Sequence, residues 1–366
     1  MTGRPQRLAR DARERGLDLL LVSSMVDVRW LTGFTGSNAL VVLDCAGEGP
    51  GIFLTDFRYV SQVAEQVPAS WDFAQAAQEL LGAGLGDNFE KAWAGPGTAR
   101  VGFDDEALTV KALDKVSDAL GDRAELVPAS GLVTRLREVK DAAETEAIRA
   151  AARLADEALL EVLDRGLAGR TETAVAFDLE VAMRSRGAQA ISFAPIVASG
   201  AHGALPHAEP RDVAIAKNEL VTIDWGCRLD GYCSDCTRTF AVGGVSDEAR
   251  SVYDLVLRAQ EESLAAVAPG AHGREVDEIA RAIIGDAGHA EHFGHGLGHG
   301  VGLEVHEGPR LSRTSESTLA AGMVVTVEPG VYLPDRLGVR IEDLVLVTEG
   351  GSDVLNTLPK VFQEVA

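Results

Sequence analysis

Short apolar runs alternate with amphipathic stretches through the first 131 residues. The chain opens on an amphipathic stretch with Leu8 and Ala12 at helical spacing. The apolar runs that predict strands are 19–22, 40–43, 51–54 and 100–103. Strand-like runs mixed with helical periodicity predict an α/β domain. The glycine-rich stretch 81–98 predicts a surface loop.

From residue 132 onward the pattern changes twice from helical to strand-like. Asp141, followed three residues later by Glu144, predicts a capping box at the start of a helix. Asp230-Gly231 predicts a tight turn between two strands. The predicted helices begin at Asp141 and Thr171 and later cover 247–268 and 274–287; the predicted strands lie within 219–242, 323–331 and 338–347. The order of helix pair, hairpin, helix pair and hairpin is a coarse internal repeat of architecture.

The segment 128–131, with the sequence PASG, separates the two patterns. The chain has 366 residues, more than one core of typical size accommodates, so two domains are expected. We place an N-terminal α/β domain over 1–131 and a second domain over 132–366. Apolar residues make up 46% of the chain and charged residues 25%, which is typical of a globular protein.

The formal net charge of −22 argues against a nucleic acid or an anionic membrane as a partner, because both require a basic surface. An acidic surface also promotes solubility, which is the simpler explanation. Residues 1–16 lack the apolar core of a secretory leader, and no apolar run approaches the roughly 18–20 residues that cross a bilayer. Cys45, Cys227, Cys233 and Cys236 are expected to be reduced and packed, which favours a cytoplasmic location.

Five residues that commonly bind metals lie in strand-like or glycine-rich segments. They are Asp224, Asp235, His299, Glu328 and Glu342. Four carboxylates and one imidazole exceed what one ion requires but suit two hard divalent cations that share bridging carboxylates. Two such ions, roughly 3.5–4 Å apart, activate water for hydrolysis. The ligand set therefore predicts a metallohydrolase.

The hairpin pattern predicts how these acids meet. With a turn at Asp230-Gly231, Asp224 and Asp235 come within diagonal cross-strand reach. Glu328 and Glu342 occupy corresponding places in the later hairpin. Acids among Val, Ile and Leu incur a large desolvation cost unless cations compensate it. For any single acid the alternative is a solvated strand edge or a structural ion pair.

The run HGLGHGVGLEVHE at 295–307 places His295, His299 and His306 among glycines that allow close backbone approach to a ligand. One imidazole suits a metal, and the others suit hydrogen bonds to a substrate carbonyl. The run does not match the dinucleotide-binding glycine pattern, and the chain lacks H-E-x-x-H and G-x-S-x-G. His207 lies in a predicted loop, where an isolated histidine is usually a surface residue.

This histidine run, together with the four carboxylates in their order, resembles the proline-specific metallopeptidases. These form the Xaa-Pro aminopeptidase and prolidase branch of the creatinase/methionine-aminopeptidase superfamily, peptidase family M24. The segments TGFTGS at 32–37, TDFRY at 55–59 and LPH at 205–207 resemble the short bacterial members, so the resemblance covers almost the whole chain. Trp225 departs from the Phe that commonly follows the first aspartate, but no ligand is missing.

The resemblance implies a creatinase-type α/β domain followed by a pita-bread α+β catalytic domain. It assigns the metal-ligand role to Asp224, Asp235, His299, Glu328 and Glu342. It also implies that His207, His295 and His306 line the substrate pocket, with His207 and His306 near the scissile and prolyl carbonyls. Arg340 would support the ligands from behind, and Glu328 would move a proton between the nucleophile and the leaving nitrogen.

The implied activity is hydrolysis of the Xaa-Pro bond at the N-terminus of peptides with proline in second position, as by an Xaa-Pro aminopeptidase. Three alternatives remain: an Xaa-Pro dipeptidase (prolidase), a creatinase-like hydrolase and a non-catalytic peptide-binding module. The complete ligand set argues against the last two. Oxygen-rich ligands favour two Mn²⁺ ions, with Co²⁺ or Zn²⁺ as alternatives. The family also implies a homodimer.

Overall fold

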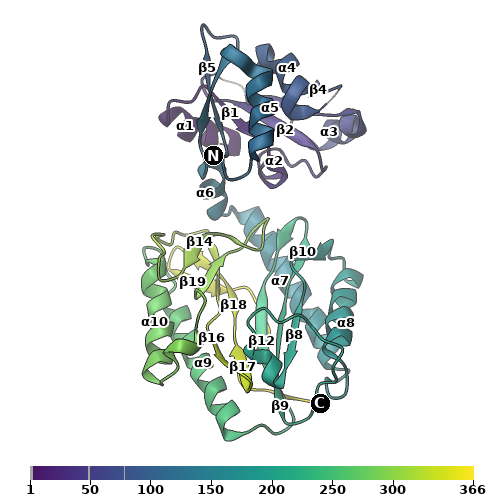
Figure 1. Cartoon of the computed structure of the whole chain (residues 1–366), viewed down its shortest axis with the longest axis vertical. Coiled ribbons are helices and arrows are strands. Elements are labelled where there is room, and N and C mark those ends of the chain that lie inside the picture. Colours follow the sequence, from purple (N-terminus) through teal and green to yellow (C-terminus); the bar gives the residue numbers. More distant parts are fainter. Residues whose placement is uncertain (1–2, 48–49, 78) are drawn as a thin grey trace. The chain divides into compact units, whose positions relative to one another are not determined.

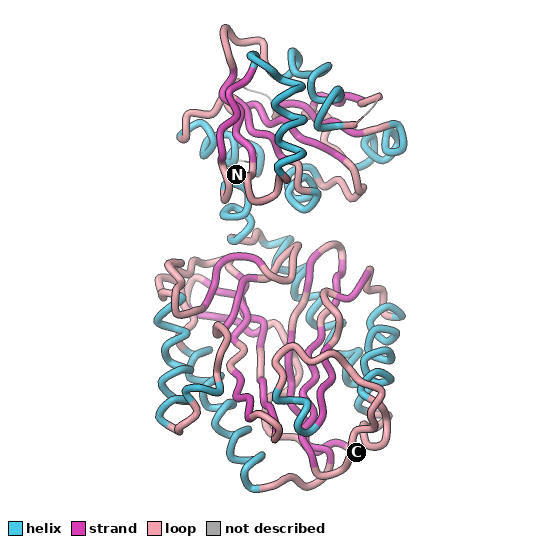
Figure 2. The backbone as a smooth tube through the Cα atoms, in the orientation of Figure 1, coloured by secondary structure: helices cyan, strands magenta, loops and turns pink. Residues whose placement is uncertain are grey.

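A computed structural model describes residues 3–47, 50–77 and 79–366 of the chain. The chain divides into two compact units, Met1–Arg137 and Glu138–Ala366. Figures 1 and 2 show that both combine helices with strands, so the predicted α/β class is confirmed. No helix in the described ranges is long and apolar enough to cross a membrane. All four cysteines are buried and unpaired, as predicted.

The N-terminal unit is built on one six-stranded sheet of order β4-β3-β2-β1-β5-β6. Its strands are β1 (Leu19–Val22), β2 (Ala39–Asp44), β3 (Gly51–Thr55), β4 (Asp72–Gln75), β5 (Ala99–Phe103) and β6 (Ala124–Pro128). Its helices are α1 (Arg4–Glu14), α2 (Met25–Thr32), α3 (Val60–Gln66), α4 (Leu85–Ala92), α5 (Val110–Leu120) and α6 (Leu132–Glu138), the last ending at the unit boundary. The four apolar runs identified from the sequence all lie in strands of this sheet.

The prediction of a surface loop over 81–98 is wrong. A short helical turn over Leu80–Gly84 leads into α4, and a loop follows only after Ala92. Leu85 and Phe89, four residues apart on α4, are both 2% exposed and belong to the apolar core of this unit. Burial of this one helical face outweighs the weak helix propensity of the glycines, which alone suggested a loop.

The C-terminal unit repeats one arrangement twice, as predicted: a helix pair followed by strands. The helices are α7 (Ala142–Leu163), α8 (Glu172–Ser185), α9 (Asp247–Ala265) and α10 (Gly273–Asp286). The capping box of Asp141 and Glu144 is present, and Thr171 and Ser246 cap α8 and α9. Figure 1 shows α7 and α8 on one side of the strands and α9 and α10 on the other.

The strands of this unit form four small sheets. They are β20-β12-β9-β8, β14-β13-β15-β18-β19, β11-β10-β7 and β16-β17. The bounds are β7 (Ala190–Ile191), β8 (Ile196–Ser199), β9 (Glu219–Trp225), β10 (Cys227–Leu229), β11 (Tyr232–Cys233), β12 (Cys236–Val242), β13 (Gly298–Gly300), β14 (Glu307–Leu311), β15 (Val324–Val327), β16 (Gly330–Leu333), β17 (Leu337–Arg340), β18 (Asp343–Thr348), β19 (Gly351–Val354) and β20 (Glu364–Val365).

Both strands of the later predicted hairpin are interrupted. The chain leaves β15 at Glu328-Pro329 before it enters β16, and it leaves β17 at Ile341-Glu342 before it enters β18. β15 pairs with β18, and β16 pairs with β17, so the two breaks occur at the same level. Proline lacks the N–H that a continuous ladder requires. Both candidate ligands of this hairpin therefore lie where the chain changes from one sheet to another.

Candidate metal centre and substrate cavity

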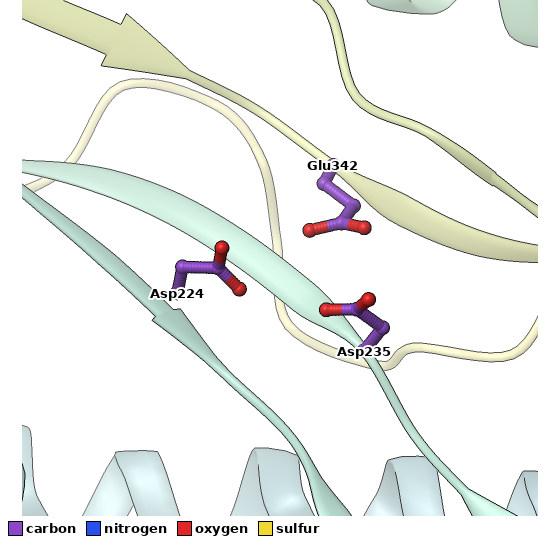
Figure 3. A group of neighbouring side chains, drawn as sticks. All are labelled: Asp224, Asp235 and Glu342. Atoms are coloured by element: carbon purple, nitrogen blue, oxygen red, sulfur yellow. The ribbon is translucent and has the colours of Figure 1, made fainter. Parts of the chain in front are cut away.

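Three carboxylates converge from different parts of the C-terminal unit. Asp224 lies near the end of β9, Asp235 just before β12, and Glu342 between β17 and β18. One carboxylate oxygen from each lies within 4.8 Å of those of the other two. Figure 3 shows the three side chains pointing toward one another. The register pairs Asp224 with Thr237, which places Asp235 diagonally across the strands, as the sequence predicted.

His299 and Glu328 adjoin this cluster. The Nε2 atom of His299 lies 3.3 Å from Oε1 of Glu328 and 3.7 Å from Oδ2 of Asp235. Its other nitrogen, Nδ1, is 3.1 Å from the carbonyl oxygen of Gly300, which only accepts, so Nδ1 carries the proton. The lone pair of Nε2 therefore faces the carboxylates, the orientation of a metal-binding imidazole held by a backbone carbonyl. All five predicted ligands thus lie in one cluster.

The electrostatics of the cluster favour a bound cation. Burial, followed by repulsion from neighbouring carboxylates, raises the pKa of Asp235 and Glu342 well above the usual range. Burial also opposes ionisation of Glu328, but its interactions with the neighbouring His299, His295 and Arg340 outweigh this cost and lower the pKa of Glu328 to about 2. The Oδ1 atom of Asp224 is buried without a hydrogen-bond partner among the described residues. An orphaned carboxylate oxygen among other oxygen donors fits a divalent cation.

A set of hydrogen bonds orients the carboxylates from behind. Thr237 donates from Oγ1 to Oε2 of Glu342 at 2.7 Å and accepts from Nε of Arg340 at 3.0 Å. Arg340 also donates to Oδ2 of Asp224 at 2.6 Å and to Oη of Tyr332 at 3.0 Å. Arg340 was identified from the sequence, but Thr237 and Tyr332 were missed. Thr237 follows Asp235 by two residues, and that period-two spacing was the available signal. Tyr332 lies beyond the break at Glu328-Pro329, so strand periodicity gave no signal for it.

Thr237→Val should weaken metal binding by about 10–100-fold, because groups that orient metal ligands typically contribute that much. The substitution preserves shape but leaves buried Glu342 and Arg340 each without one hydrogen bond, so a thermal melt is needed to separate lost affinity from lost stability. Competition with a coloured chelator would measure the dissociation constant. Thr348→Val, at the far end of β18, is the matched control and should bind metal as the unchanged protein does. Equal affinity in the two variants would show that Thr237 does not orient Glu342.

A cavity of about 710 Å³ opens beside the cluster. All five predicted ligands line it, together with Arg340 and the three predicted pocket histidines, His207, His295 and His306. Its apolar wall comes mainly from two segments: Phe193, Ala194, Pro195, Ile196, Pro206, Ala208 and Pro210. Arg310, Ser312 and Thr314 line it as well and were not identified from the sequence. The candidate residues therefore surround one space with both polar and apolar walls.

The three pocket histidines are not equivalent. His295 is occupied within the protein: Nδ1 lies 2.8 Å from the carbonyl oxygen of Gly296, and Nε2 lies 2.9 Å from Oη of Tyr332. Burial lowers its pKa, consistent with a neutral ring that accepts from the tyrosine. His207 and His306 make no side-chain hydrogen bond with a described residue. Those two are the imidazoles with nitrogens available to a ligand.

Comparison with known proteins identifies the family of this chain. Residues 146–349 match Metallopeptidase family M24, and residues 4–139 match the Creatinase/Prolidase N-terminal domain. The chain belongs to family M24. The match to the M24 family covers more than half of the chain and contains all five candidate ligands, and the resemblance inferred from the sequence is confirmed. The creatinase-type and pita-bread folds that it implied are confirmed by the same matches.

Individual M24 proteins are similar over most of the chain. An Xaa-Pro dipeptidase from Pyrococcus furiosus is 41% identical over 247 residues, which are 68% of this chain and 67% of the relative. The structure of an Xaa-Pro dipeptidase from Bacillus anthracis has a TM-score of 0.91 and 37% identity, covering 98% of each chain. The X-Pro aminopeptidase from Thermotoga maritima has a TM-score of 0.87 and 34% identity, covering 97% of this chain and 99% of that one.

Proposed function

We propose that this M24 protein is a metal-dependent Xaa-Pro dipeptidase that uses two divalent cations. The sequence favoured an Xaa-Pro aminopeptidase, with the dipeptidase as the alternative. The relatives support the alternative better, because the Pyrococcus and Bacillus proteins are both Xaa-Pro dipeptidases. Mn²⁺ stays the proposed ion because the donors are mostly carboxylate oxygens. The homodimer, the cytoplasmic location and the domain boundary after residue 131 stay predictions.

The observation that carries the dipeptidase proposal is the position of Arg310 in the cavity wall. Arg310 pairs in register with His299 across β13 and β14, so both side chains project from the same face. Arg340, the cavity's other arginine, already pairs with Asp224 at 2.6 Å. Arg310 makes no ion pair with any residue in the described ranges. Burial lowers the pKa of His306, and the charge of Arg310 adds to that shift. A proline carboxylate, present only in a dipeptide, supplies the missing partner.

The proposed reaction assigns a task to each group around the cavity. The five ligands Asp224, Asp235, His299, Glu328 and Glu342 would hold the cations. When bound, the cations supply acidified water as the nucleophile and polarise the scissile carbonyl. His207 and His306 donate hydrogen bonds to the substrate carbonyl oxygens, where negative charge develops. Glu328 is ionised and takes the proton from the attacking water, then delivers it to the prolyl nitrogen as the bond breaks.

Arg310→Met should raise KM for an Xaa-Pro dipeptide about 10–100-fold, the equivalent of a lost charge-assisted hydrogen bond. Methionine retains the length of the side chain but not its charge. The same variant should hydrolyse an Xaa-Pro amide, which has no carboxylate, as well as the unchanged protein does. Arg313→Met, three residues further along the chain, is the control. If KM for the dipeptide did not change, Arg310 would not bind the substrate carboxylate.

The proposed specificity is tested by comparing Ala-Pro with Ala-Pro-Ala as substrates of the Mn²⁺-loaded protein. We expect kcat/KM for the dipeptide to exceed that for the tripeptide by at least about tenfold, since only the dipeptide places a carboxylate at the prolyl residue. Equal or faster cleavage of the tripeptide would favour the hypothesis that the protein is an Xaa-Pro aminopeptidase.

A further inference from the structure

One buried carboxylate holds both ends of the loop that carries His207. Glu172, the first residue of α8, is fully buried. Its Oε1 atom accepts from the backbone N–H of Ser199 at 2.9 Å and from its hydroxyl at 3.0 Å. Its Oε2 atom accepts from the backbone N–H of Arg211 at 2.9 Å. Ser199 ends β8, and Arg211 closes the segment that follows, so the two anchor points enclose residues 200–210.

Further contacts make the attachment strong at each end. The guanidinium of Arg211 donates from Nε and Nη2 to the two oxygens of Glu172 at 3.1 and 3.0 Å. The Nδ1 atom of His202 lies 3.0 Å from Oε2 and 3.2 Å from Oε1. Burial opposes ionisation of Glu172, but the hydrogen bonds from Arg211 and Ser199 lower its pKa to about 2. The carboxylate of Glu172 is therefore charged, and both of its oxygens accept hydrogen bonds from the ends of the loop.

The interior of the loop is held from the other side. Nη1 of Arg340 donates to the carbonyl oxygen of Pro206 at 3.0 Å. A β-carbon at Gly338 would lie 1.7 Å from the carbonyl oxygen of Gly203, so the loop backbone rests directly against β17. His207 itself is exposed and has no side-chain hydrogen bond to a described residue. Its position therefore depends on the backbone of its loop rather than on contacts of its ring.

We propose that Glu172 is a positioning residue that fixes the 200–210 loop so that His207 reaches the substrate carbonyl. Glu172 does not line the cavity, and it acts only through the loop. The effect on catalysis rests on the role proposed above for His207. A displacement of about 1 Å in a group that contacts the reacting centre can lower a rate about 100-fold.

The test is a double-mutant cycle of Glu172→Gln with His207→Ala, read as kcat/KM for Ala-Pro. We expect Glu172→Gln to lower kcat/KM by about 10–100-fold with unchanged metal stoichiometry. In the His207→Ala background the same change should have a clearly smaller effect, because the loop then positions only its apolar wall residues Pro206, Ala208 and Pro210. Independent, multiplicative effects, or a fully active Glu172→Gln variant, would overturn the proposal.

Hydrogen exchange provides a readout that does not need activity. Glu172→Gln should accelerate amide exchange in residues 200–211 at least about tenfold while leaving residues 293–297 unchanged. Glu180→Gln, a partly exposed acid on the same helix paired with Arg184, is the control and should alter neither segment. Arg211→Met removes only part of the attachment and serves if Glu172→Gln does not fold. Unchanged exchange in 200–211 would overturn the proposal even if the protein proved not to cleave Xaa-Pro peptides, a result that would separately overturn the proposed function.

Discussion

Glu328→Gln should lower kcat for Ala-Pro by about 10²–10⁴-fold, the range expected when a general acid–base group is lost. Glutamine preserves the size of the side chain and can still accept the 3.0 Å hydrogen bond from Thr326. It cannot take a proton from water, and it is a weaker ligand for a hard cation. The loss should therefore appear in turnover rather than in folding, and steady-state kinetics together with a thermal melt would separate the two.

The matching control for this substitution is Glu349→Gln, in the exposed turn after β18. It changes the same functional group without touching the cavity, and its turnover should equal that of the unchanged protein. Retention of more than about a tenth of the activity in Glu328→Gln would contradict the role of Glu328 in proton transfer. A comparable loss of turnover in Glu349→Gln would instead indicate a general effect of removing a negative charge.

Metal removal should destabilise the protein, and the loss should grow as pH rises. The folded-state pKa values of Asp224, Asp235 and Glu342 are raised, with burial as the largest cause. A raised carboxyl pKa stabilises the fold below the unfolded pKa of about 4, and that stability is lost as pH rises through the folded value. Glu328, with a pKa of about 2, stays ionised in the folded state and adds no slope above about pH 5, where the unfolded glutamate is also ionised.

Added Mn²⁺ binds the ionised carboxylates and removes this penalty, so its stabilising effect should increase with pH. At about 100 times the dissociation constant, each ion should contribute about 2.7 kcal/mol to the free energy of unfolding. The measurement is the difference in Tm between Mn²⁺-loaded and chelated protein at pH 5 and pH 8. Because both samples share one sequence, other titrations largely cancel. A difference that shrinks with rising pH would contradict a carboxylate metal site.

Local sequence patterns predicted much of the fold because the relevant interactions are local. The strand at 19–22 coincides with β1, since four apolar residues in succession have no polar face to expose. The capping box at Asp141 needs only the residue three positions later. By contrast, α4 depends on burial of Leu85 and Phe89 against a sheet whose strand order is not visible in a pattern of apolar runs. The glycines nearby favoured a surface loop, which is why the helix was not predicted.

The residues of the candidate site also differ in whether local sequence patterns could place them. Asp224 and Asp235 could be brought together from the sequence because one short turn joins their strands. Arg310 could not be placed, because its proximity to His299 depends on the pairing of β13 with β14. Glu172 is further removed, since it meets Ser199 and Arg211 only through the packing of α8. The candidate ligands and Arg340 were therefore within reach of sequence reasoning, whereas Arg310 and Glu172 required the tertiary structure.

The most direct test of a proline-specific metallopeptidase is release of free proline from Ala-Pro by protein stripped with a chelator, before and after Mn²⁺ is restored. Ala-Ala serves as the comparison substrate. We predict no release from the stripped protein, rapid release after Mn²⁺ is added, and little hydrolysis of Ala-Ala under the same conditions. Absence of proline release with every divalent ion tried, or equal cleavage of Ala-Ala, would contradict the proposed function.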